Sequence, residues 1–167
     1  MTKIKGENME SLDLTDADAY KLISIFKKTI SKNKYVLTEG SKGKIKISGL
    51  LDGTERQFVL YYMYAIDNIH LNFSDASTRY TLVRINLDSS FHKNSDGKVY
   101  GHRVEIFSEE EYRAKNDTFT HYKAYPLPHN SFKDCDDFFT ALQQMFDYTN
   151  VKNHSSISFI EDNILSI

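Results

Sequence analysis

The spacing of apolar residues predicts a helix near the start of the sequence. In "LTDADAYKLISIFKKTI", apolar side chains recur at helical intervals, at Ala19, Leu22, Ile23, Phe26 and Ile30. Thr15 is a suitable N-cap, and Asp16 and Asp18 favour the N-terminal end of the helix dipole. We therefore expect a helix that begins after Thr15 and ends at the polar "SKNK" segment.

From residue 35 the period of the pattern changes to two, which indicates strands. The segment "KIKISGL" alternates, "DG" at 52–53 is a hairpin signal, and "RQFVLYYMYA" follows as an aromatic strand. Further strands are predicted in "IHLNF", "RYTLVRINL", "HRVEIF" and "FTHYKAYPLP". The charged run "SEEEYRAKND" is expected to be a solvated loop.

A second amphipathic helix is predicted over 134–148. Its apolar stripe consists of Phe138, Phe139, Leu142, Met145 and Phe146. The order of helix, strands and helix predicts an α+β fold, with an antiparallel sheet and the N-terminal and C-terminal helices packed on one face. We expect residues 1–167 to form a single domain, with loose ends at 1–13 and 151–167, although "ISFI" could instead add a short strand.

The predicted sheet has more tyrosine than one core requires. Of the 11 tyrosines, we expect Tyr62, Tyr64 and Tyr80 to lie on the open face of the sheet. Tyrosine is enriched at protein interfaces, so these residues are candidates for binding a partner protein. The alternative is ordinary cross-strand packing.

Composition excludes several classes of protein. A formal net charge of −2 without a basic stripe argues against direct binding of nucleic acid. Cys135 is the only cysteine, which rules out an internal disulfide and fits a reducing compartment. The sequence has no long apolar run and no signal-peptide pattern, so we expect a cytoplasmic monomer with no membrane contact.

Two histidines flank a turn in "FHKNSDGKVYGHRVEIF". His92 and His102 stand on either side of the Asn-Ser-Asp-Gly turn, and a hairpin would bring them together. Structural zinc sites use four nitrogen, sulfur or oxygen ligands, so we predict a zinc site completed by His121, Cys135 or Glu105. The alternative is that these histidines are solvated or hydrogen-bonded.

An enzymatic reading of the same residues is a toxin-like RNase. His92 and His102 would be the acid and base, with Arg103 or Lys93 stabilising the phosphoryl transition state. The sequence has no nucleophile elbow, P-loop or zinc-protease motif. Binding is therefore favoured over catalysis.

The stretch from about Tyr80 to Asn153 resembles an uncharacterised family of small proteins carried by phages and mobile elements of Gram-positive bacteria. The similarity is carried by "LVRINL", "HKNSDG", "HRVEIF", "AYPLP" and the aromatic closing helix. The family pattern has a second histidine before an Ile-aromatic pair. Glu105 stands at that position here.

Such proteins resemble anti-CRISPR proteins directed at the type II effector nuclease. This resemblance implies that the chain inhibits the effector by direct protein contact, blocking target DNA loading or cleavage, with zinc as a structural component. The near-neutral charge is consistent with contact rather than DNA mimicry, which needs a dense acidic face.

Overall fold

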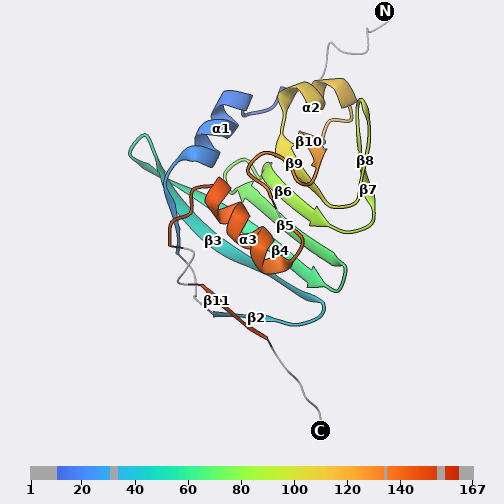
Figure 1. Ribbon diagram of the computed structural model, residues 1–167. Helices are drawn as coiled ribbons and strands as arrows, with labels where there is room; N and C mark the ends of the chain where they lie inside the picture. The colour runs from blue at the N-terminus through green and yellow to red at the C-terminus, as the bar shows by residue number, and fades with distance from the viewer. Residues whose placement is uncertain (1–10, 31–33, 134, 154–156, 162–167) are drawn as a thin grey trace, which may run out of the picture.

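A seven-stranded antiparallel sheet forms the centre of the molecule (Figure 1). The computed structural model describes residues 11–30, 34–133, 135–153 and 157–161, so the expected loose segment at 1–10 lies outside it. The strand order is β1-β3-β4-β5-β6-β9-β10. The bounds are β1 Lys27–Thr29, β3 Ser41–Leu51, β4 Thr54–Ala65, β5 Asn68–Asp75, β6 Thr81–Leu87, β9 Arg103–Phe107 and β10 Tyr122–Pro126.

Two smaller strand pairs and three helices complete the described fold. The hairpin of β7 (Phe91–Asn94) and β8 (Gly97–Tyr100) follows β6, and β2 (Lys34–Leu37) pairs in parallel with β11 (Ser158–Glu161). The segment "ISFI" thus contributes to a strand. The helices are α1 Asp16–Ser24, α2 Glu109–Lys115 and α3 Phe138–Tyr148. The α+β class predicted from the sequence is confirmed.

Helix α1 has the predicted start but ends earlier than expected. The Thr15 side chain accepts a hydrogen bond from the Asp18 backbone N–H, and Asp18 caps Thr15 in return. The predicted continuation to Ile30 is wrong. Ile25 is extended, and β1 then pairs with β3, so Phe26 and Ile30 are exposed instead of lying on a helical stripe.

The charged run after β9 forms helix α2, so the predicted solvated loop is also wrong. Ser108 caps the helix by accepting from the Glu111 backbone N–H, and Asn116 ends it in a left-handed conformation. Glu111 and Tyr112 are buried. With only these two buried positions, the helix is too short to produce a recognisable apolar period.

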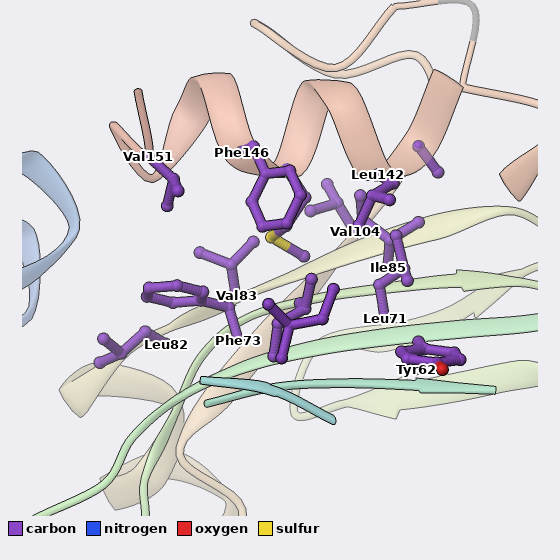
Figure 2. Close-up of a cluster of buried hydrophobic side chains, with 14 of the residues drawn as sticks. Tyr62, Leu71, Phe73, Leu82, Val83, Ile85, Val104, Leu142, Phe146 and Val151 are labelled. Carbon is purple, nitrogen blue, oxygen red and sulfur yellow. The ribbon is translucent and has the colours of Figure 1, made fainter. Parts of the chain in front are cut away.

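Helix α3 covers the apolar face of the central strands (Figure 2). Asp137 caps it by accepting from the Thr140 backbone N–H, so the helix starts a few residues later than predicted. Its buried face packs on alternate side chains of the sheet, and the cluster drawn in Figure 2 includes Leu71, Phe73, Val83, Ile85, Val104, Leu142 and Phe146. Leu22 and Ile23 of α1 belong to the same core.

The β7–β8 hairpin is fastened to the rest of the molecule by polar side chains. Asn94 is buried, and its side-chain amide donates to the Ala124 carbonyl and accepts from the Ala124 N–H, at 2.8 and 2.9 Å. Glu111 of α2 accepts from the Ser95 N–H and hydroxyl in the turn. These bonds fix the hairpin beside β10 and α2.

Lys27 is fully buried where α1, β1 and α3 meet. Its ammonium nitrogen lies 2.8 Å from the Ile23 carbonyl oxygen, 2.9 Å from that of Ile25 and 2.7 Å from that of Thr149, the C-cap of α3. Burial lowers the pKa of Lys27 to about 7. The charged form has one N–H donor for each carbonyl, and positive charge is favourable at helix C-termini.

Within the described ranges, no helix has the length and apolar character needed to span a membrane.

We predict that Lys27→Met lowers the free energy of unfolding by roughly 2 to 4 kcal/mol, because it leaves buried carbonyls without donors. Lys28→Met is the matched control, since Lys28 is the next residue of β1 and is exposed. That control should change stability by less than about 0.5 kcal/mol. Urea denaturation of both variants measures the difference, and equal losses would contradict the role assigned to Lys27.

Candidate functional site

The sheet face opposite α3 is polar. Because side chains alternate along each strand, the residues that flank the buried Leu71, Ile85 and Val104 point to this second face. We call it the polar face. Strand register aligns its central residues in two rows, Tyr61–Asn72–Arg84–Glu105 and Met63–His70–Asn86–Arg103.

A cavity of about 540 Å³ opens on the polar face. Both rows line it, together with residues from β3, with Tyr62 and with His92 of the β7–β8 hairpin. His92 reaches the cavity because Asn94, two residues later in β7, anchors the hairpin against Ala124. The volume lies in the range of about 300 to 1,000 Å³ that is typical of small-molecule sites.

Glu105 lies at the centre of the charged groups in the cavity. It is almost fully buried, and Glu105 Oε1 lies 3.2 Å from His92 Nδ1 and 3.6 Å from Arg103 Nε. Arg84 Nη1 lies 3.5 Å from Glu105 Oε2 and donates to the Tyr122 hydroxyl at 3.2 Å. The buried carboxylate therefore has cationic or hydrogen-bonding groups on several sides, as a buried charge requires.

Two buried nitrogen atoms that line the cavity have no hydrogen-bond partner among the described residues. They are His92 Nε2 and Arg103 Nε. The rest of the Arg103 guanidinium is occupied, because Nη1 donates to Asp88 at 2.7 Å and to the Gly101 carbonyl at 2.9 Å. Leaving a buried polar atom unpaired costs about 1 to 3 kcal/mol, so both atoms favour a polar group in the cavity.

The environment of His92 favours its neutral form. Burial lowers the pKa of His92, although the nearby Glu105 carboxylate acts in the opposite direction. With Nδ1–H directed at Glu105, the neutral ring presents the Nε2 lone pair to the cavity. His70, the other histidine in the cavity, has both ring nitrogens engaged, Nδ1 with Asn86 at 2.5 Å and Nε2 with Asn68 at 2.6 Å.

Of the residues predicted to bind zinc, the structure pairs only His92 with Glu105. The turn forms a hairpin as expected, but Val99 is the residue opposite His92. His102 lies exposed between β8 and β9, and it does not line the cavity. The expectation that the hairpin places the two histidines opposite each other is therefore wrong.

The remaining zinc candidates have other roles in this structure. His121 accepts from the Thr81 N–H at Nε2 and bonds the Phe119 carbonyl through Nδ1, so both nitrogens are occupied. Cys135 is buried in the hydrophobic core, and burial raises the pKa of its thiol to about 12. In the part of the chain that the structure describes, no three His, Cys, Asp or Glu residues are grouped to hold a metal.

The placement predicted for two of the three tyrosines is wrong. Tyr62 and Tyr64 point toward α3, with ring centroids 5.9 and 5.8 Å from that of Phe138. Tyr80 is partly buried against His121, and its hydroxyl accepts from the Asp13 N–H. Tyr61 is the tyrosine of this run that lies on the polar face, with 48% of its surface exposed.

Sequence reasoning missed the arginine, asparagine and histidine residues of the two rows. A signal was present, because Arg84 and Asn86 alternate with buried residues in β6, and Arg103 and Glu105 do the same in β9. Each pair marks one polar side of a strand. The signal does not reveal that β6 and β9 are neighbours in the sheet, and this adjacency assembles the cavity.

Comparison with known proteins gives one match. Residues 14–151 match a family described as a family of unknown function, DUF6978. No curated protein and no solved structure matches the chain.

The zinc site stays a prediction from the sequence, and elemental analysis tests it. It requires about one equivalent of zinc in protein purified without a metal-affinity tag. Chelation should then lower the melting temperature, because metal bound only by the folded state stabilises it. Less than about a tenth of an equivalent of any transition metal would contradict the prediction.

We predict that stability falls as the pH is lowered from about 7 to 5. Burial lowers the pKa of His121 in the folded protein, so the unfolded chain binds a proton first and gains stability as the pH falls. Protonation would also displace the hydrogen bond from the Thr81 N–H. Urea denaturation across this pH range measures the slope.

His121→Gln should reduce that slope, because the glutamine carbonyl can accept from Thr81 without titrating. His102→Gln is the control, since His102 is exposed, and its slope should match that of the wild type. Some slope should persist in His121→Gln, because burial also lowers the pKa of His92. Identical slopes in both variants would contradict the assignment.

Proposed function

We propose that this chain, which belongs to the family of unknown function DUF6978, binds a small polar ligand in the cavity of its polar face. The observation that carries the proposal is the pair of buried nitrogens, His92 Nε2 and Arg103 Nε, that have no partner among the described residues. A ligand that bonded to both would recover the free energy lost in burying them.

The lining of the cavity supports binding more than catalysis. The RNase alternative needs His92 and His102 as acid and base, and His102 is not among the lining residues. Arg103 and Glu105 bind each other and their neighbours, which fixes their side chains before a ligand arrives. Preorganised polar groups of this kind give affinity and specificity without a chemical step.

A variant that fills the cavity provides the test. Met63→Trp places a large side chain in the lining, whereas Val59→Trp, on the same face of β4, lies outside it. Small polar compounds of neutral, anionic and cationic classes are screened by calorimetry against the wild type. We expect at least one class to bind and Met63→Trp to lose at least about tenfold in affinity. Equal affinity in both variants, or no binding by any class, would contradict the proposal.

The second proposal is that the chain inhibits a type II CRISPR effector nuclease by direct contact. It rests on the resemblance of the second half of the sequence, and exposed aromatic residues favour it. Phe91 and Tyr100 pair on the β7–β8 hairpin, 44% and 64% exposed, and Tyr61 is exposed on the polar face. In this proposal both terminal helices cover the opposite face of the sheet and leave these aromatics to anchor a partner.

Purified protein mixed with guide-loaded effector tests this second proposal. We expect target cleavage to fall, and a Phe91→Ala/Tyr100→Ala variant to restore it. Tyr20→Ala is the control, because Tyr20 is an exposed tyrosine on α1, away from the hairpin. Undiminished cleavage at about a tenfold excess over effectors from several low-GC hosts, with no co-eluting complex, would contradict the inhibitor function.

A further inference from the structure

The cavity contains hydrogen-bonding groups of opposite kinds. Arg103 Nε carries a hydrogen and can only donate, whereas neutral His92 presents a lone pair at Nε2 and accepts. A simple anion such as a deprotonated carboxylate or a fully ionised phosphate would satisfy the arginine and leave the histidine unpaired. A neutral sugar would satisfy the histidine but leave the positive charge without a counterion.

The charge of the lining favours an anion. Lys42, Arg84 and Arg103 are positive, and Glu105 is the one carboxylate among the lining residues. Asp88, which is bound to Arg103, reduces the excess from two positive charges to one. Arg84 is about one-third exposed at the cavity, so its guanidinium can bind an oxyanion without unfolding any part of the sheet.

We infer that the ligand is a small hydroxylated oxyanion, such as a sugar phosphate or a hydroxy acid, whose anionic group binds Arg103 Nε–H and Arg84 while its hydroxyl donates to His92 Nε2. This inference rests on the proposed ligand-binding function and adds the chemical class. Phosphate and carboxylate share the required geometry, since both present oxygen acceptors to a guanidinium.

Matched ligands test each half of the inference in the wild-type protein. Glycerol 3-phosphate and ribose 5-phosphate are compared with ethyl phosphate, and lactate with propionate, to isolate the hydroxyl. Glycerol and ribose isolate the anion. We expect each hydroxylated anion to bind about fivefold to tenfold more tightly than its counterpart without the hydroxyl, because one hydrogen bond is gained. The phosphate and carboxylate arms show which oxyanion the cavity prefers.

Variants of His92 identify the acceptor. His92→Asn keeps an amide donor toward Glu105 but removes the acceptor at the Nε2 position, so the preference for hydroxylated anions should disappear. His92→Gln places a carbonyl oxygen near that position and should restore the preference. Arg84→Met should weaken all anions by about tenfold or more while leaving the ratio between matched pairs unchanged.

The outcomes separate the inference from the function on which it rests. Binding of neutral polyols as tight as that of the anions, or no preference for the hydroxyl in the wild type, overturns the ligand class and leaves cavity binding intact. Binding of any compound that Met63→Trp does not weaken overturns both. Circular dichroism confirms that each variant is folded, and the wild-type comparison decides the question even where a variant does not fold.

Discussion

The ammonium group of Lys27 joins parts of the chain that are far apart in sequence. It bonds the last carbonyls of α1 and the C-cap carbonyl of α3, while the backbone of the same residue pairs with β3. Any rearrangement of these elements would leave a buried charge or buried carbonyls unpaired, and both are costly. The positions of α1 and α3 relative to the first edge of the sheet therefore depend on this one side chain.

The opposite face of the sheet depends on a second buried charge. Glu105 is surrounded by His92, Arg84 and Arg103, which come from three different strands. Because ion pairs of this kind stabilise a fold only weakly, the arrangement does not explain why so many polar residues occupy the middle of a sheet. Recognition of a polar molecule gives the arrangement a purpose.

Most of the strands could be predicted from the sequence because their residues alternate. The register of "FVLYYMYA" could not, since a run that is apolar on both sides of the strand does not show which side is buried. For this reason Tyr62 and Tyr64 were assigned to the wrong face. Helix α2 was missed because its stability comes from its caps and from the buried Glu111, neither of which produces a hydrophobic period.

The pairing of His92 with Glu105 illustrates what local patterns leave out. The sequence separation of His92 and His102 suggested a partnership, but a side chain on a short hairpin faces whatever the hairpin packs against. Here that is β9 and β10, and the partner is a carboxylate three residues beyond His102. Predicting this contact requires knowing how the hairpin docks, which is a tertiary property.

The amide of Asn94 has a consequence beyond holding the hairpin. Strand β10 is at one end of the sheet, and the Asn94 side chain occupies both hydrogen-bonding groups of Ala124 that face outward from it. A strand of another molecule that tried to add to this border would find the groups at Ala124 already taken. The molecule thus resists growth of its sheet into a larger aggregate by imitating, with a single side chain, the strand that would otherwise dock there.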